Sequence, residues 1–471
     1  MPDRSLLSSR HRVAPAVALP LCAAASLAHA GTEPTIAWGT YYTGEHSSSY
    51  LHGLGALPDG SFMVLGGPND SFHGERISRF DASGRPQWSL LYAGAGEGRV
   101  IALTIVPGQS DFYVAGETEA DEGIATAGAH QSTRTCFGHG ARCAADALVA
   151  RFDDTGERQW GTYFGGPFDD RIVAAAADAT GALHVCGETG SPSGIATPDG
   201  YQTTLVGEFA GFVAVFEPTG LLRWATYYDD SCSAIALDEP GDAVYVAGGT
   251  EAGDLATPGA HQEAADDGRD AYLARFTGDG ELVWSTYYGG PGDDLGEAVR
   301  VDADGAVYLL GTTDSATAIA TAGAHQDRLG GSSDVFLVRF TAGGEREWAT
   351  YFGGAEYDQA ADLAVDDEGR LYLGATVMSD DLATPNAPRR HVAGGRDALV
   401  ARFDGTGALE WATYYGGEND DYVSALALSP DGSVYLGGFT NSTTGIFTPG
   451  AYQEIGTTGP AAYIVRLLQG S

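Results

Sequence analysis

One short phrase recurs seven times along this chain of 471 residues, and it limits the possible fold more than any other feature. Two of its copies read WGTYFGGPFDD, from Trp160, and WSTYYGGPGDD, from Trp284. Most copies start about 60 residues apart, and a recurrence of this length indicates a repeat architecture. The phrase accounts for every tryptophan in the sequence: Trp38, Trp88, Trp160, Trp224, Trp284, Trp348 and Trp411.

Each repeat carries four strand patterns and no helical period. In the repeat that contains Trp284, the patterns are ELVWSTYYGG, EAVRVDADG, AVYLLGTT and VFLVRF, with a long loop before the last of them. Four strands per repeat, seven times over, are typical of a β-propeller. The sequence therefore predicts an all-β fold, a seven-bladed β-propeller with four antiparallel strands per blade.

Two further patterns predict how the strands are arranged. The Ala- and Val-rich strands, such as AIALDE, suit the crowded centre, whereas the Trp-Tyr-Tyr strands suit the wide outer edge. The chain starts with an outer strand in residues 35–44 and ends with YVSALALSPDG, SVYLGGFT and AAYIVRLL, which lack an outer strand. We therefore expect the N-terminal outer strand to join the C-terminal blade and close the ring.

The repeats resemble a known family. DALVARFDDTGERQWGTYFGG (residues 146–166), DAYLARFTGDGELVWSTYYGG (270–290) and DALVARFDGTGALEWATYYGG (397–417) are similar to the SBBP repeat. That repeat is named for a seven-bladed β-propeller and occurs in bacterial exported and surface proteins. The resemblance covers essentially all of residues 31–471 and implies the same fold, but it supplies no catalytic residues.

Residues 1–30 have the features of a signal peptide. Arginines precede the apolar segment VAPAVALPLCAAASLA, and the tripeptide ending at Ala30 is a small-x-small cleavage site. We expect a secreted protein, in the periplasm, at the cell surface or outside the cell, with residues 31–471 as a single propeller domain. No later apolar run reaches 18 residues, so no membrane insertion is expected. The formal net charge of −38 disfavours nucleic acid as a partner.

The cysteines after the leader suit an oxidising compartment. Cys136 and Cys143 flank a Gly-rich insertion, and we expect them to form a disulfide. A zinc site made from the same two cysteines and two nearby histidines is the less favoured alternative. Cys186 and Cys232 either pair across neighbouring repeats or remain small buried thiols.

Carboxylate pairs follow the tryptophan phrase at equivalent positions, and two interpretations of them are open. Calcium prefers several oxygen ligands, so the pairs could form a ring of calcium sites. Alternatively, each aspartate accepts backbone N–H groups in a turn. No other cofactor is indicated. The pairs consist of Asp169, Asp170, Asp293, Asp294, Asp420 and Asp421.

The GAHQ loops and one unusual loop supply the other polar candidates. His130, His261 and His325 occupy the place that Tyr201 and Tyr452 take in other repeats, which indicates packing residues with a polar tip rather than metal ligands. A local basic spot in PRRHVAGGRD is either an anion-binding site or a solvated loop. It consists of Arg389, Arg390 and His391.

The sequence favours a binding or interaction scaffold over an enzyme. No nucleophile elbow, HExxH or P-loop motif is present. The near-identity of most repeats suits a monomeric scaffold that binds a surface protein or an extracellular glycan through its loops. The alternative is a carbohydrate-active hydrolase or lyase with carboxylates in the central channel, because propellers host both functions.

Overall fold

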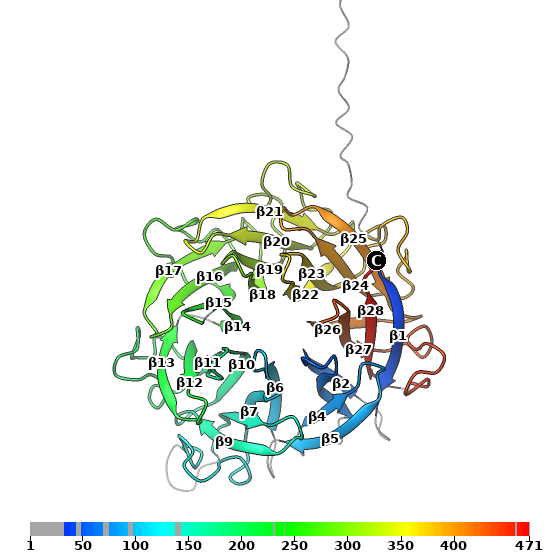
Figure 1. Cartoon of the computed structure of the whole chain (residues 1–471). Helices are drawn as coiled ribbons and strands as arrows, with labels where there is room; N and C mark the ends of the chain where they lie inside the picture. The colour runs from blue at the N-terminus through cyan, green and yellow to red at the C-terminus, as the bar shows by residue number, and fades with distance from the viewer. Residues whose placement is uncertain are drawn as a thin grey trace, which may run out of the picture. The chain divides into compact units, whose positions relative to one another are not determined.

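The described residues form 28 strands and no helix, arranged in seven four-stranded antiparallel sheets around a central axis (Figure 1). The computed structural model describes residues 33–43, 49–68, 75–92, 98–136, 143–228, 231–239, 241–456 and 459–470. All of these belong to the unit Gly31–Ser471, and the signal peptide expected in residues 1–30 lies outside them. None of the described segments is a helix with the length and apolar character of a membrane span.

The sheets are the blades, numbered here in chain order. Blade 1 contains β2 (Ser49–Ala56), β3 (Phe62–Pro68), β4 (Glu75–Phe80) and β5 (Pro86–Tyr92). Blade 2 contains β6 (Gly98–Ile105), β7 (Phe112–Thr118), β8 (Asp146–Phe152) and β9 (Arg158–Phe164). Blade 3 contains β10 (Asp170–Ala177), β11 (Leu183–Thr189), β12 (Ala210–Phe216) and β13 (Leu222–Tyr228). Blade 4 contains β14 (Ser231–Leu237), β15 (Ala243–Thr250), β16 (Asp270–Thr277) and β17 (Leu282–Tyr288).

The remaining blades follow the same order. Blade 5 contains β18 (Asp294–Val301), β19 (Val307–Thr313), β20 (Asp334–Phe340) and β21 (Arg346–Phe352). Blade 6 contains β22 (Asp358–Val365), β23 (Leu371–Val377), β24 (Asp397–Phe403) and β25 (Leu409–Tyr415). The composite blade contains β26 (Asp421–Leu428), β27 (Val434–Thr440), β28 (Ala461–Leu468) and, as its outer strand, β1 (Thr35–Tyr42).

The seven-bladed fold, the four strands per blade and the ring closure are as the sequence predicts. β1 pairs antiparallel with β28, in a register that runs from Thr35 opposite Leu468 to Tyr42 opposite Ala462. The first strand of each blade is innermost and the tryptophan strand is outermost (Figure 1). The apolar core is divided into seven clusters, each formed by two neighbouring blades, so the blades are held to one another by side-chain packing.

The tryptophans fasten the seams between neighbouring blades. Trp224 Nε1 of blade 3 donates to the carbonyl oxygen of Gly278, at 2.8 Å, in the hairpin between the third and outer strands of blade 4. Gly280 in that hairpin lies against the indole ring, and a Cβ at this glycine would come within 2.8 Å of ring atoms. Its φ of +89° is also one that glycine adopts most easily. The same indole-to-carbonyl bond joins Trp38 to Ala82, Trp88 to Asp154, Trp160 to Pro218, Trp284 to Ala342 and Trp348 to Gly405.

The seam between blade 6 and the composite blade, called the closing seam below, lacks this hairpin. β28 and β1 come from opposite ends of the sequence, so no turn joins the third and outer strands of the composite blade. Trp411 is fully buried there, and its Nε1 has no hydrogen-bond partner among the described residues. Arg402 Nη1 instead donates to the side-chain oxygen of Gln469, at 2.6 Å.

Candidate functional site

The loops from outer to first strands and from second to third strands leave the blades on one side, the loop face. On this face the tryptophan phrase anchors the long GAHQ loops. In blade 5, Thr321 Oγ1 donates to the Ala349 carbonyl at 3.1 Å, and the Ala349 amide donates back to Thr321 Oγ1. The Gln326 amide donates to Thr350 Oγ1 at 2.9 Å. The residues that follow each tryptophan therefore recur because they hold a loop in place.

The histidines of the GAHQ loops pack against aromatic rings. The His325 ring lies edge-on to Phe403 of the next blade, with centroids 5.7 Å apart. Tyr201 takes the equivalent place against Phe276. Burial lowers the pKa of His325, so its imidazole is neutral near pH 7. These contacts agree with the packing role that the His-to-Tyr alternation predicts.

The first aspartate of each pair is exposed or half-buried and accepts a backbone N–H group. Asp293 Oδ1 accepts from the Arg269 amide at 3.1 Å, and Asp169 Oδ1 accepts from the Ala145 amide at 2.9 Å. Asp420 Oδ1 is bonded in the same way. Each of these bonds ties the start of a third strand to the turn that leads into the next blade.

The second aspartate of each pair is buried at the start of a first strand. Asp294 Oδ2 accepts from the Gly290 amide at 2.8 Å and from Ser315 Oγ at 2.7 Å. Asp170 and Asp421 accept from the equivalent glycine and serine. The two aspartates of a pair thus have separate roles in the turn, and calcium binding by them remains a prediction.

A further set of aspartates, at the start of third strands, faces the buried aspartates that open the first strands of the next blades. A Cβ at Gly416 would lie 2.6 Å from Asp397 Cγ and 2.7 Å from Asp421 Oδ2, so the two carboxyl groups meet across this glycine. Sequence reasoning missed this arrangement, although the aspartate that opens DALVARF and DAYLARF was its signal. The set consists of Asp146, Asp270, Asp334 and Asp397, all of which are buried.

Burial and the facing carboxylate shift these groups toward the neutral form. Desolvation raises the pKa of Asp146 to about 7, and the charge of Asp170 raises it as well. Desolvation raises the pKa of Asp270 and of Asp334 to about 6, as it does for Asp170 and Asp421. A fraction of these buried carboxyl groups is therefore protonated at pH values where free aspartate is fully ionised.

The basic spot predicted at residues 389–391 is divided between different contacts. Arg389 donates to the carbonyl oxygens of Gly416 and Gly445, and its guanidinium lies 4.6 Å from the Tyr415 ring centroid. His391 Nδ1 is 3.0 Å from Asp380 Oδ2, and Arg390 is exposed. Anion binding at this loop remains a prediction, with Arg389 already engaged in holding two turns.

One exposed group in the described part of the chain has the geometry to contact a metal ion. Ligand atoms of Asp380, Asp381 and His391 lie within 4.8 Å of one another. All three side chains are exposed, and the imidazole is already bonded to Asp380. This group joins a residue of the predicted basic spot to two carboxylates that the sequence did not single out.

Both cysteine pairs form disulfides. Cys136 and Cys143, which the sequence predicts to pair, have Cα atoms 4.7 Å apart. Cys186 of β11 and Cys232 of β14 are also bonded, with Cα atoms 6.0 Å apart, so the second of the two sequence alternatives does not apply. This second disulfide ties blade 3 to blade 4.

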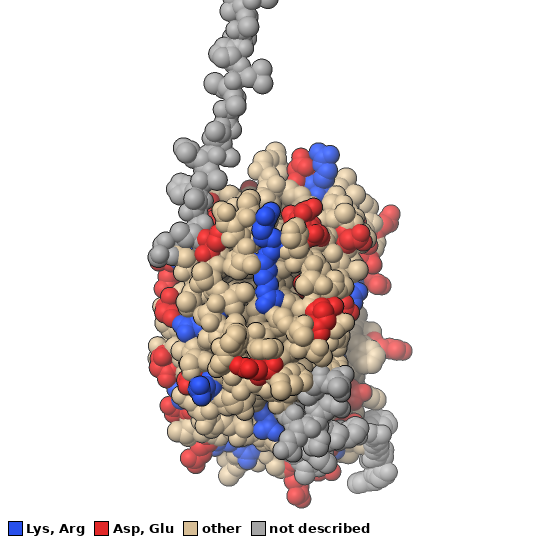
Figure 2. All heavy atoms as spheres, turned by 90° about the vertical axis from the view of Figure 1, so that its right-hand side faces the viewer, with Lys and Arg blue, Asp and Glu red and all other residues tan. Residues whose placement is uncertain are grey.

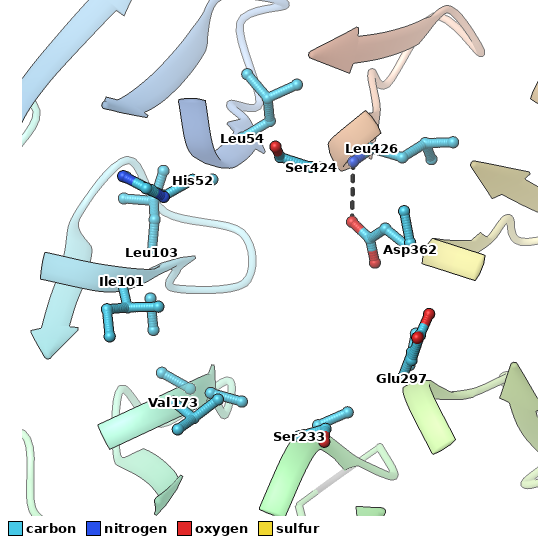
Figure 3. Close-up of a pocket in the computed structure, with 18 of the residues that line it drawn as sticks. His52, Leu54, Ile101, Leu103, Val173, Ser233, Glu297, Asp362, Ser424 and Leu426 are labelled. Atoms are coloured by element: carbon cyan, nitrogen blue, oxygen red, sulfur yellow. Dashed lines mark hydrogen bonds between the residues drawn. The ribbon is translucent and has the colours of Figure 1, made fainter. Parts of the chain in front are cut away.

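The central channel is where the blades differ most. Every first strand shifts register at the same point, and the extra residue lines a cavity of about 230 Å³ (Figure 3). A bulge of this kind redirects one side chain. The seven extra residues are His52, Ile101, Val173, Ser233, Glu297, Ala361 and Ser424.

The channel carboxylates are engaged with the walls. Asp362 Oδ2 accepts from the Leu426 amide at 2.8 Å (Figure 3). Its Oδ1 accepts from Arg300 Nη2 at 2.7 Å, so this carboxylate connects three blades. Glu297 Oε1 accepts from Thr312 Oγ1 at 3.2 Å, and its Oε2 is buried. Desolvation raises the pKa of Glu297 to about 7. Glu297 and Asp362 have no equivalent acid in the other blades, and their hydrogen bonds connect the strands that form the channel wall.

Comparisons with known proteins agree with this architecture. The family model of the SBBP beta-propeller repeat matches residues 347–376, from β21 to β23. This chain contains an SBBP repeat. The resemblance read from the sequence is thereby confirmed, and the repeat builds a seven-bladed propeller here.

The protein is also similar to one curated protein in part of its sequence and to two solved structures in its fold. The regulatory protein FlaEY of Caulobacter vibrioides is 27% identical over 143 residues, which are 30% of this chain and 15% of that protein. The WD40 repeats of RRP9 align with a TM-score of 0.50 at 9% identity, covering 93% of this chain and 99% of that one. U3-55K aligns with a TM-score of 0.50 at 10% identity, covering 92% and 99%. At this identity the two structures show a shared fold alone.

Proposed function

We propose that this SBBP-repeat propeller is an exported interaction scaffold that binds a surface protein or an extracellular glycan through its loop face. The observation that carries the proposal is the placement of exposed apolar side chains. Twelve large hydrophobic residues are exposed among those described, and eight of them lie in loops of the loop face. Exposed apolar groups gathered on one face are a mark of an interaction site. The eight are Phe168, Tyr201, Val206, Phe209, Tyr357, Met378, Tyr452 and Ile455.

Two parts of the loop face are the most prominent. Phe209 and Val206, in the loop between β11 and β12, are 70% and 62% exposed. Tyr357 and Met378 of blade 6 adjoin each other, since the Met378 amide donates to the Tyr357 carbonyl at 3.1 Å. The polar side chains that recur in the repeats on this face, the aspartates and the threonines, form hydrogen bonds that hold the loops in place.

The charge distribution supports a partner other than a nucleic acid. The formal net charge is −38, and the side of the composite blade shows carboxylates spread widely with a few arginines between them (Figure 2). Nucleic-acid binding depends on a basic surface that neutralises phosphates. A protein or glycan partner places no such demand on the surface.

Binding to the cells that export the protein tests the proposal. Labelled residues 31–471 should bind the cell surface saturably, and Val206→Ser/Phe209→Ser, Tyr357→Ser/Met378→Ser or both should weaken the binding at least tenfold. Leu91→Ser/Val283→Ser is the control, because these exposed side chains lie on outer strands. Equal losses in all variants, or no saturable binding, would refute the proposal. A panel of oligosaccharides assayed for cleavage covers the alternative of a channel hydrolase or lyase.

A further inference from the structure

One position of the loop face carries different side chains in the composite blade and in blade 3. It is the second residue of the first strand, which stands opposite the second-to-last residue of the second strand. In blade 3 the pair is Arg171 and Glu188, which form an ion pair at 2.6 Å. In the composite blade the pair is Tyr422 and Phe439, which stack with centroids 4.3 Å apart and planes 13° apart. Rings therefore replace charges at this place.

The stacked pair is the middle of a longer row that crosses three blades. Phe439 contacts Tyr50 of blade 1, with centroids 5.2 Å apart. On the other side, the Arg396 guanidinium lies 5.7 Å from the Tyr422 ring centroid and 6.0 Å from that of Tyr357. We call Tyr357, Arg396, Tyr422, Phe439 and Tyr50 the aromatic run. It lies at the loop-face ends of the strands of blade 6, the composite blade and blade 1.

The aromatic run combines apolar ring surface with unused hydrogen-bonding groups. Tyr357 is 39% exposed, and the other four members are half-buried. Arg396 Nη1 donates to the Tyr422 hydroxyl at 2.8 Å, while the Tyr357 and Tyr50 hydroxyls make no hydrogen bond within the described part of the chain. Such a surface suits a ligand with apolar C–H faces and many hydroxyl groups.

The charges near the aromatic run select against an anionic ligand. Asp420 lies beside Arg396 and offsets its charge, since Asp420 Oδ1 accepts from the Arg396 backbone amide at 3.1 Å. The hydrogen bond to the Tyr422 hydroxyl, and to a smaller extent the charge of Asp420, raise the pKa of the Arg396 guanidinium. The formal net charge of −38 also repels polyanions at long range. A neutral chain of sugars meets neither obstacle.

We propose that the aromatic run binds a neutral oligosaccharide laid across blade 6, the composite blade and blade 1. This inference rests on the proposed loop-face function and names its partner class and location. The rings contact the sugar faces, and the tyrosine hydroxyls and the remaining Arg396 donors bond to sugar hydroxyls. The row from Tyr357 to Tyr50 sets the axis along which the ligand lies.

Calorimetric titration of residues 31–471 tests this inference. The probes are cellohexaose, chitohexaose, laminarihexaose and mannohexaose, with hexagalacturonic acid as the anionic counterpart. At least one neutral hexasaccharide should bind, and the anionic one should not. Tyr357→Ala should weaken the binding about tenfold or more, and Tyr422→Phe, which keeps the ring, should weaken it less. Both variants should melt near the wild-type temperature, since Tyr357 lies in a loop and Tyr422 keeps its stack.

Leu91→Ala is the control, because this side chain is exposed on the outer strand β5 and lies outside the loop face. Its sugar affinity should equal that of the wild type. The inference is wrong if no neutral hexasaccharide binds, if the anionic one binds better, or if Leu91→Ala reduces affinity as much as Tyr357→Ala. Saturable cell binding without any sugar binding would overturn this inference alone, whereas loss of both would also remove the loop-face function.

Discussion

Six seams of the propeller pack a tryptophan ring against a hairpin of the next blade, whereas the closing seam buries its tryptophan without such a hairpin. At an ordinary seam such as that of Trp224, a hairpin of the next blade supplies a carbonyl acceptor and a glycine that lies on the indole. At the closing seam the hairpin is missing, Trp411 Nε1 is left without an acceptor among the described residues, and the side chain of Gln469 bonds to Arg402. The comparison shows that indole burial closes a seam, while the hairpin adds a hydrogen bond.

The largest effect is expected from removing the strand that completes the composite blade. Deletion of residues 35–44 leaves β28 with an unpaired edge and exposes the apolar clusters on both sides of the composite blade. We expect loss of the cooperative melting transition in differential scanning calorimetry. Deletion of residues 31–34 alone is the control and should melt near the full-length temperature. A chain without residues 35–44 that melts like the full-length protein would contradict ring closure by β1.

The second effect is a dependence of folding stability on pH, which we expect at both kinds of seam. The facing acids Asp270 and Asp294 lie at an ordinary seam, and Asp397 and Asp421 lie at the closing seam. Desolvation raises the pKa of Asp270 and of Asp421 to about 6, and raises that of Asp397 as well. A raised carboxyl pKa contributes stability that is complete below the unfolded pKa and is lost as pH rises through the folded pKa.

The melting temperature should therefore be several degrees higher at pH 5 than at pH 8, as measured by calorimetry. Asp270→Asn and Asp397→Asn should each reduce this difference, because an amide keeps the shape and cannot ionise. Equal reductions would show that the closing seam differs from the others in its hairpin alone. A melting temperature that rises between pH 5 and pH 8 would contradict the predicted direction.

The third effect separates indole contact from backbone strain. Gly280 and Gly305 both have positive φ, +89° and +82°, but only Gly280 lies against a tryptophan ring. Gly305→Ala should cost about 1 kcal/mol, because alanine is strained at positive φ. Gly280→Ala should cost about 2–3 kcal/mol more, because its methyl group also meets the indole. Urea unfolding measures both, and equal costs would show that the turn glycine does not depend on the tryptophan.

The smallest effect is the hydrogen bond that distinguishes the two kinds of seam. Trp224→Phe and Trp411→Phe lose similar packing, since the side chains are 3% and 0% exposed. Trp224→Phe also loses the bond to Gly278 and leaves that carbonyl unpaired, which should cost about 1 kcal/mol beyond Trp411→Phe. The free energy of unfolding in urea checks this difference. A larger loss at Trp411 would show that its N–H group is satisfied in solution.

The blade count, the strand order and the ring closure could be predicted because they depend on local patterns repeated seven times. Period-2 strands, turn residues and the tryptophan phrase agree in each copy, so errors in one repeat are corrected by the others. The packing role of His325 could be predicted for the same reason, because Tyr201 marks the equivalent place.

The site details could not be predicted because they depend on contacts between blades. Asp397 meets Asp421 across a seam, which no local pattern specifies. The sequence also left open whether Cys186 pairs with Cys232, because that choice depends on how blades 3 and 4 meet. Glu297 enters the channel wall because its strand bulges at that residue, and the position of a bulge is set by pairing with β19. The aromatic run likewise joins rings from three blades that are far apart in the sequence.

The pairing of Thr35 with Leu468 also determines when the fold can be finished. β1 has no strand partner until β28 has been synthesised, whereas each of the other outer strands pairs with the strand just before it. Blades 1 to 6 can therefore assemble in order as the chain emerges, while the ring remains an open arc. Completion is a single late event that joins the two ends, so a chain truncated during synthesis has no route to the closed form.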